Sequence, residues 1–77
     1  MSTARQEAAR ARAALAASKA LDRAAKAMNG YMAACRACGD SLEADDSRVL
    51  LVGNMAEYSG YLFARFNVPL DRIGGRA

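Results

Sequence analysis

Two cysteines have the spacing that most resembles a chemical motif, in the stretch Cys35-Arg36-Ala37-Cys38. A structural zinc site needs four ligands, usually cysteine or histidine, and this chain has two cysteines and no histidine. One chain therefore cannot complete such a site, although the pairs of a symmetric dimer could form a metal or disulfide site together. Redox use favours a cysteine at a helix N-terminus, whereas these end a helical pattern. We interpret Cys35 and Cys38 as small buried hydrophobic residues.

The rest of the sequence shows no catalytic, cofactor-binding or metal-binding residues. There is no histidine for acid–base work, no nucleophile-elbow motif and no phosphate-binding loop. The carboxylates gather mainly in one stretch, residues 40–46, which reads as a connection between helices. We therefore expect a protein that is not an enzyme and that uses no cofactor.

The composition indicates a small helical domain whose two halves differ. Nineteen of the 77 residues are alanine, the strongest helix former. Residues 1–38 carry seven basic and two acidic side chains, whereas residues 39–77 carry four basic and six acidic ones and most of the large apolar residues. A single domain of this size has a marginal core and commonly needs a second subunit. We expect one helical domain over residues 1–77, with residues 67–77 as a partly ordered tail.

The first helix is predicted over residues 3–38. Ser2 and Thr3 are candidate N-caps, and the spacing from Thr3 to Gln6 matches a capping box. Gly39 stands where a left-handed C-cap is common. The pair Asn29-Gly30 is a point at which this helix could kink or break.

A heptad pattern predicts which face of the first helix is buried. One row holds Ala14, Leu21, Met28 and Cys35, and its partner row holds Ala17, Ala24, Tyr31 and Cys38. A flanking row of alanines at 13, 20, 27 and 34 extends this surface. We expect this alanine-lined seam to pack closely against the second helix.

The second helix is predicted to begin near residue 41 or near residue 47 and to end near Phe66. Asp40-Ser-Leu-Glu43 matches a capping box, while Asp46 or Ser47 would cap a later start. A rival interpretation takes residues 49–52 as a buried strand. Pro69 disfavours helical geometry at the residue before it, which sets the predicted end. Val68, Leu70 and Ile73 could then fold back onto the hairpin.

The faces of the second helix predict a core and a binding surface. The predicted core face is Val49, Val52, Ala56, Ser59, Phe63 and Phe66, flanked by Met55, Leu62 and Gly60. The opposite face is too apolar for a solvated surface, and tyrosine is enriched where interface binding energy concentrates. We expect the partner-binding residues to be Leu50, Leu51, Tyr58, Tyr61 and Arg65.

Basic residues recur along the first helix, one per heptad. This basic row comprises Arg5, Arg12, Lys19 and Lys26, with Arg23 beside it. It is typical of a solvated face, and it could also steer approach to an acidic protein or contact nucleic-acid phosphates.

Together these patterns predict an all-α antiparallel helical hairpin that dimerises into a four-helix arrangement. The function that fits is a small protein-binding regulator, of the adaptor, inhibitor or anti-activator type, that occupies a surface of a larger protein partner. The alternatives are a nucleic-acid-binding dimer that uses the basic row and a structural subunit of a larger assembly. Charged residues interrupt every long apolar stretch, so we expect no membrane association and a cytoplasmic location.

Overall fold

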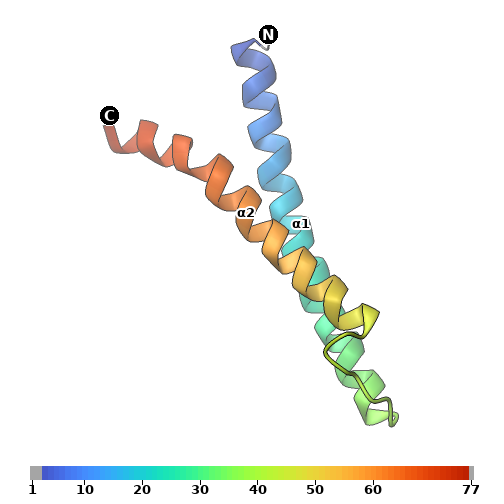
Figure 1. Ribbon diagram of the computed structural model, residues 1–77. Helices are drawn as coiled ribbons and strands as arrows, with labels where there is room; N and C mark the ends of the chain where they lie inside the picture. Colours follow the sequence, from blue (N-terminus) through green and yellow to red (C-terminus); the bar gives the residue numbers. More distant parts are fainter. Residues whose placement is uncertain (1–2, 77) are drawn as a thin grey trace.

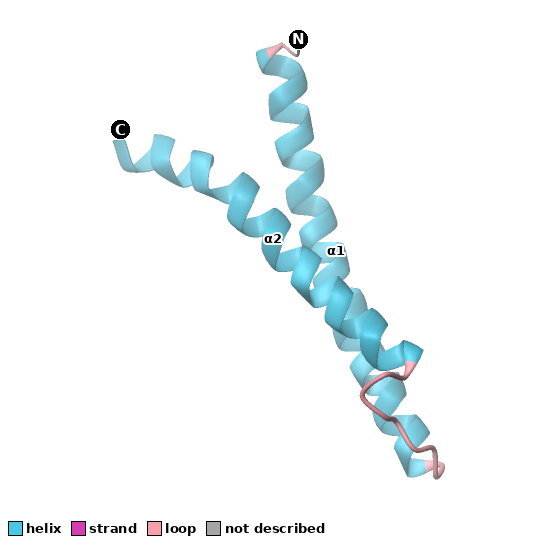
Figure 2. Cartoon of the chain, viewed as in Figure 1, coloured by secondary structure: helices cyan, strands magenta, loops and turns pink. Residues whose placement is uncertain are grey.

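Two packed helices make up the computed structural model, which describes the backbone of residues 3–76 and the side chains of residues 3–67. Helix α1 spans Ala4–Ala37 and helix α2 spans Ser47–Arg76. They run antiparallel and are joined by a loop over residues 38–46, as Figures 1 and 2 show. The predicted all-α hairpin is confirmed, and the stretch 49–52 is helix rather than strand.

Both ends of α1 are capped as its sequence predicts. The Thr3 hydroxyl accepts a hydrogen bond from the Gln6 N–H at 3.1 Å, and the Gln6 side chain accepts one from the Thr3 N–H at 2.8 Å. At the other end Gly39 has a φ of +100°, a backbone conformation that is sterically strained for any residue with a Cβ. The Gly39 and Asp40 N–H groups donate to Arg36 and Cys35 carbonyls, which is a Schellman motif. Between these caps the helix continues through Asn29-Gly30 without a break.

Helix α2 begins at the later of its two predicted starts. The Asp46 side chain accepts a hydrogen bond from the Arg48 N–H at 2.9 Å, and its carbonyl accepts one from the Leu50 N–H. Asp46 is therefore the N-cap. The earlier start at Asp40 is wrong, because residues 40–43 are not helical and Ser41 donates to the Glu43 carboxylate instead of to a helix terminus.

The predicted end of α2 near Phe66 is also wrong, since the helix continues through Pro69 to Arg76. A proline removes one backbone donor and disfavours the helical region for the preceding residue, but a helix can continue past it with a bend. Figure 1 shows α2 curving away from α1 toward the C-terminus. The predicted contacts of Val68, Leu70 and Ile73 with the hairpin lie outside the described side chains.

The core is a thin strip where the two helices touch. Its most buried apolar residues are Ala25, Met32 and Cys35 on α1 and Leu62 on α2. None of the described side chains falls below 2% exposure. Because two helices alone cannot enclose a side chain from every direction, much apolar surface remains outside this strip.

One of the two rows predicted for the buried face of α1 is correct and the other is not. In the first row Ala14, Leu21 and Met28 are partly buried and Cys35 is buried, whereas in the second row only Ala24 is partly buried and Ala17, Tyr31 and Cys38 are exposed. The true partner row lies on the other side of the correct one, and it comprises Ala11, Ser18, Ala25 and Met32. Alanine occurs on every face of this helix, so the heptad pattern does not distinguish these two rows.

The buried face of α2 is likewise rotated from its prediction. Ser59 is buried and Val49, Val52 and Phe66 are partly buried, as expected. Ala56 and Phe63 are exposed, while the flanking residues Met55 and Leu62 turn inward. Ala56 and the neighbouring Gly60 therefore lie at the edge of the contact with α1.

Candidate functional site: an exposed apolar surface on the second helix

The predicted partner-binding residues lie on the side of α2 that α1 does not cover. Leu50, Leu51, Tyr58 and Tyr61 are exposed by 52, 47, 55 and 51%, and Arg65 is exposed as well. Helical geometry explains this grouping, because Leu51, Tyr58 and Arg65 are spaced by seven residues and so share one side of the helix. Each of the four apolar side chains thus has apolar area available to a partner.

The two tyrosines form the centre of this surface. The ring centroids of Tyr58 and Tyr61 are 5.3 Å apart, with the ring planes inclined by 39°. That separation is within the range preferred by aromatic pairs. Glu57 lies beside the rings and lines a shallow hollow with them. The result is an aromatic pair with a carboxylate at its edge.

A second edge of this surface is marked by a cationic cluster near the open end of the hairpin. The Arg65 guanidinium carbon lies 5.3 Å from the centroid of the Phe66 ring, and that of Arg10 on α1 lies 5.8 Å from it. Both distances permit cation–π attraction. Arg65 is therefore engaged with Phe66, while its side chain remains exposed.

The basic row lies on the outer side of α1. All five residues of this row are exposed. Lys26 pairs with Asp22 at 3.1 Å, and the two side chains are 76 and 56% exposed. An exposed pair of this kind adds little to stability. The row is thus displayed along the outer surface of the hairpin.

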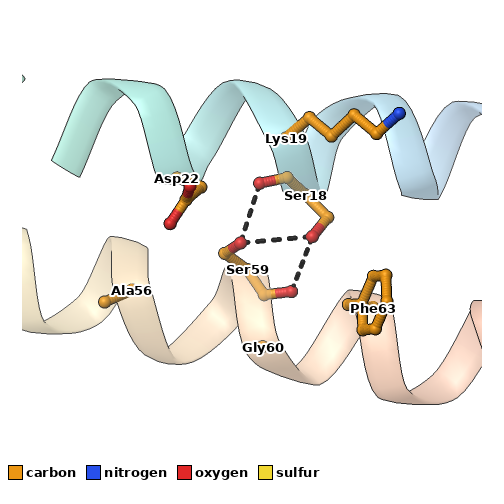
Figure 3. A pocket seen from close by; sticks show the side chains of 7 residues that line it. All are labelled: Ser18, Lys19, Asp22, Ala56, Ser59, Gly60 and Phe63. Atoms are coloured by element: carbon orange, nitrogen blue, oxygen red, sulfur yellow. Dashed lines mark hydrogen bonds between the residues drawn. The ribbon is translucent and has the colours of Figure 1, made fainter. Parts of the chain in front are cut away.

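A serine pair that the sequence patterns did not reveal lies where the helices cross. The Ser18 hydroxyl donates to the Ser59 carbonyl at 2.8 Å, and the Ser59 hydroxyl donates to the Ser18 carbonyl at 2.7 Å. Their hydroxyl oxygens are 3.1 Å apart, and both residues are buried. Figure 3 shows this reciprocal arrangement. Ser59 lies on the predicted core face, whereas Ser18 was not predicted to be buried; its heptad row holds Ala25 and Met32, which are buried and could have placed it in the core.

One side of this crossing carries a shallow groove. Its lining includes Lys19 and Asp22 on α1 and Ala56, Gly60 and Phe63 on α2, as Figure 3 shows. Phe63 is 52% exposed. The stripe of small side chains at Ala56 and Gly60 borders this groove and not the surface that bears the tyrosines.

Arg48 holds the closed end of the hairpin together. Its guanidinium donates to the Asp46 carboxylate at 2.9 and 2.8 Å and to Asp40 at 3.1 Å. Hydrogen bonds from the Arg48 side chain and N–H lower the pKa of Asp46 to about 2. The same side-chain bonds, first to Asp46 and then to Asp40, raise the pKa of Arg48. The ionised carboxylate of Asp46 and the guanidinium of Arg48 therefore stabilise the loop.

The two cysteines occupy different environments. Cys35 is buried, as predicted, whereas Cys38 is exposed and is the C-cap residue of α1. The interpretation of Cys38 as buried is wrong because α1 ends there and because Cys38 belongs to the same heptad row as Ala17 and Tyr31, which are exposed as well. Both thiols are free. Within the part of the chain that the structure describes, no three cysteine or carboxylate side chains are grouped to hold a metal ion.

Over the described residues, neither helix is both long enough and apolar enough to span a bilayer. Comparison of the chain with protein-family models, with curated proteins and with solved structures finds no match.

Proposed function

We propose that this protein is a small non-enzymatic binding protein that modulates a larger protein by occupying one of its surfaces. The observation that carries the proposal is the group of four large apolar side chains, Leu50, Leu51, Tyr58 and Tyr61, each about half exposed on one helix. Apolar and aromatic groups arranged in this way are the usual anchors of protein interfaces.

Charge at the edges of this surface would orient the partner. Glu57 and Arg65 flank the tyrosines and are exposed, so they can form polar contacts around an apolar centre, which is the common anatomy of an interface. The basic row on the outer side of α1 adds a positive field that favours approach to an acidic protein. The proposed targets are therefore proteins with an apolar groove and an acidic surround.

Affinity capture with a matched pair of variants tests the proposal. Leu50→Arg places a charge in the proposed anchor surface, whereas Phe63→Arg places the same charge at an equally exposed position beside the groove. We expect a host protein to be enriched by the wild-type chain and by Phe63→Arg and to be lost with Leu50→Arg, as measured by quantitative mass spectrometry. A soluble, folded bait that captures nothing, or equal capture by both variants, would contradict the proposal.

The exposed basic row supports a second candidate function, which is nucleic-acid binding. A protein that neutralises several phosphates loses affinity steeply as salt rises. Titration of a fluorescent oligonucleotide at low and moderate salt, with the wild type and with a Lys19→Glu, Arg23→Glu variant, distinguishes the two functions. Binding that is weakened strongly by both salt and the charge reversals would favour the nucleic acid.

A further inference from the structure

The exposed tyrosines of α2 lie beside a row of alanines on α1. The groove seen in Figure 3 occupies one side of the helix contact and is bordered by Lys19, Asp22, Ala56 and Gly60. Tyr58 lies on the other side of α2, because helix positions two residues from Ala56 and Gly60 point nearly the opposite way at about 100° per residue. The α1 residues on that other side form the seam that was predicted to be buried.

The tyrosines and the alanines lie at the same level along the helix axes. Because the helices are antiparallel, each residue before Ser59 on α2 lies level with the corresponding residue after Ser18 on α1, and the reverse. Tyr58 is therefore level with Lys19, and Tyr61 with Ala16. Leu51 is likewise level with Lys26. The alanines of the seam therefore flank the tyrosines on a surface shared by both helices. We call this the tyrosine–alanine face, and it comprises Leu51, Tyr58 and Tyr61 of α2 with Ala13, Ala17, Ala20 and Ala24 of α1.

The two halves of the tyrosine–alanine face differ in how far their side chains project, but both are largely apolar. The α2 half projects large side chains, while the α1 half is a smooth strip of methyl groups on a helix that can be approached closely. None of its seven members is charged; Glu57 lies at the edge beside the tyrosine rings, and Arg65 lies one heptad beyond Tyr58 toward the open end of the hairpin. Depletion of charge marks the centre of an interface. If a second copy is rotated by 180° about an axis parallel to the helices, the projecting α2 half of each copy faces the flat α1 half of the other.

We propose that a second copy of this chain covers the tyrosine–alanine face, so that the tyrosine row of each copy packs on the alanine row of the other. In this dimer α2 of one chain lies on α1 of its partner, and every neighbouring helix pair is antiparallel. The product is a four-helix bundle with the serine pairs inside and the basic rows outside. This inference rests on the proposed function in taking the same side of α2 as a binding surface, and it names the first occupant of that surface.

The exposed area of the single chain is what such a dimer requires. The chain exposes 5723 Å², whereas a compact monomer of 8.2 kDa exposes about 4,500 Å². The excess of roughly 1,200 Å² is larger than the roughly 800 Å² that each partner buries in a typical stable interface. The radius of gyration, 16.9 Å, likewise exceeds the value of about 11–12 Å for a compact domain of this length. A second hairpin packed on the tyrosine–alanine face would bury part of this excess area.

Leu50 and the basic row remain accessible in this dimer. Leu50 lies on the outer side of Leu51, away from the alanine seam, and the basic row is exposed on the outer side of α1. A larger partner therefore binds the dimer at its edge, through Leu50 and the basic row, and reaches Leu51, Tyr58 and Tyr61 only by displacing the second copy. For this reason Leu50→Arg is expected to leave the dimer intact, and the capture experiment and the dimer experiment can fail separately.

Light scattering after size exclusion tests the inference on the full chain. We expect a mass of twice the chain mass, with Tyr61→Arg weakening dimerisation by roughly 30-fold, as for an interface hot spot. Phe63→Arg and Ala33→Glu, at exposed positions outside the face, should remain dimeric. A monomeric wild type, or an unchanged dimer for Tyr61→Arg, would overturn the inference and leave the capture result to be judged by itself.

A mixing experiment tests the proposed pairing of tyrosines with alanines. Ala20→Glu and Tyr58→Arg should each fail to self-associate, because a charge then faces an apolar row in both halves of the dimer. Mixed together, they should form a heterodimer, since the carboxylate introduced in one chain faces the guanidinium introduced in the other and the second contact remains wild type. Circular dichroism follows helix content at the same time. If mixing restores neither association nor lost helicity, the pairing is wrong.

Discussion

Two polar arrangements, the serine pair at the crossing and the Arg48 cluster at the closed end, stabilise the hairpin in different ways. At the crossing, two neutral hydroxyls bond to carbonyls 41 residues away in the chain and are buried. At the closed end, the charged Arg48 reaches carboxylates two and eight residues away, and these contacts are exposed or only partly buried. The first arrangement holds the tertiary contact, while the second shapes the loop. Their responses to mutation and pH should differ accordingly.

The largest expected effect comes from apolar packing beside the crossing. Leu62 is 9% exposed and lies one turn from Ser59, so Leu62→Ala should lower the free energy of unfolding by about 2–4 kcal/mol. Urea unfolding at a fixed protein concentration measures the change. The matched control Leu50→Ala removes the same side chain at an exposed position, and its cost should be much smaller. Equal costs would mean that the crossing contributes no more to stability than the surface does.

Removal of the serine hydroxyls should have an intermediate effect. Ser18→Ala and Ser59→Ala each remove one hydrogen bond to a backbone carbonyl, which contributes about 1 kcal/mol, while alanine's better helix propensity returns about 0.5 kcal/mol. Because the two hydroxyl oxygens are 3.1 Å apart in one buried network, the cost of the double variant should fall short of the sum of the two single costs by about 0.5 kcal/mol or more. Strict additivity would mean that each bond from a hydroxyl to a carbonyl acts independently of the other.

The smallest effect is expected at the closed end and depends on pH. The pKa of Asp46 in the folded state is about 2, below its ordinary value of 3.8. The unfolded chain therefore binds this proton first as the pH falls, and the stabilisation present at neutral pH is lost between about pH 5 and pH 2. Thermal unfolding across this range should show a drop in wild-type stability that Asp46→Asn reduces. An identical pH profile for Asp46→Asn would assign the drop to other carboxylates.

Local sequence signals predicted both ends of α1 and one of the two alternatives for the start of α2, whereas the Asp40 capping box and the end near Phe66 were wrong. The Thr3 capping box, the Gly39 cap and the Asp46 start each depend on a few adjacent residues, and all three are present. The buried face of α1 depends on which of several apolar rows meets α2. Alanine populates most of these rows, so hydrophobic periodicity could not choose between them.

The serine pair at the crossing was predicted only in part, because Ser59 lies on the predicted core face and Ser18 does not. Ser18 is polar, and its burial becomes favourable only because Ser59, far away in the sequence, accepts and donates in return. The aromatic surface was predicted correctly to be exposed, because Leu50, Tyr58 and their neighbours lie opposite a recognisable core row. The occupant proposed for that surface is a separate molecule, so the periodicity within one chain could not identify it.

The reciprocal serine bonds also fix how far one helix can slide along the other. A slip of one heptad would set Ser18 against Val52 or Phe66, whose side chains are bulkier than that of Ser59 and would keep the Ser18 hydroxyl from approaching the α2 backbone. Each buried hydroxyl would then have only a carbonyl of its own helix as an acceptor, and the two bonds between the helices would be lost. The serine pair therefore favours one alignment of α1 and α2 over its heptad-shifted alternatives.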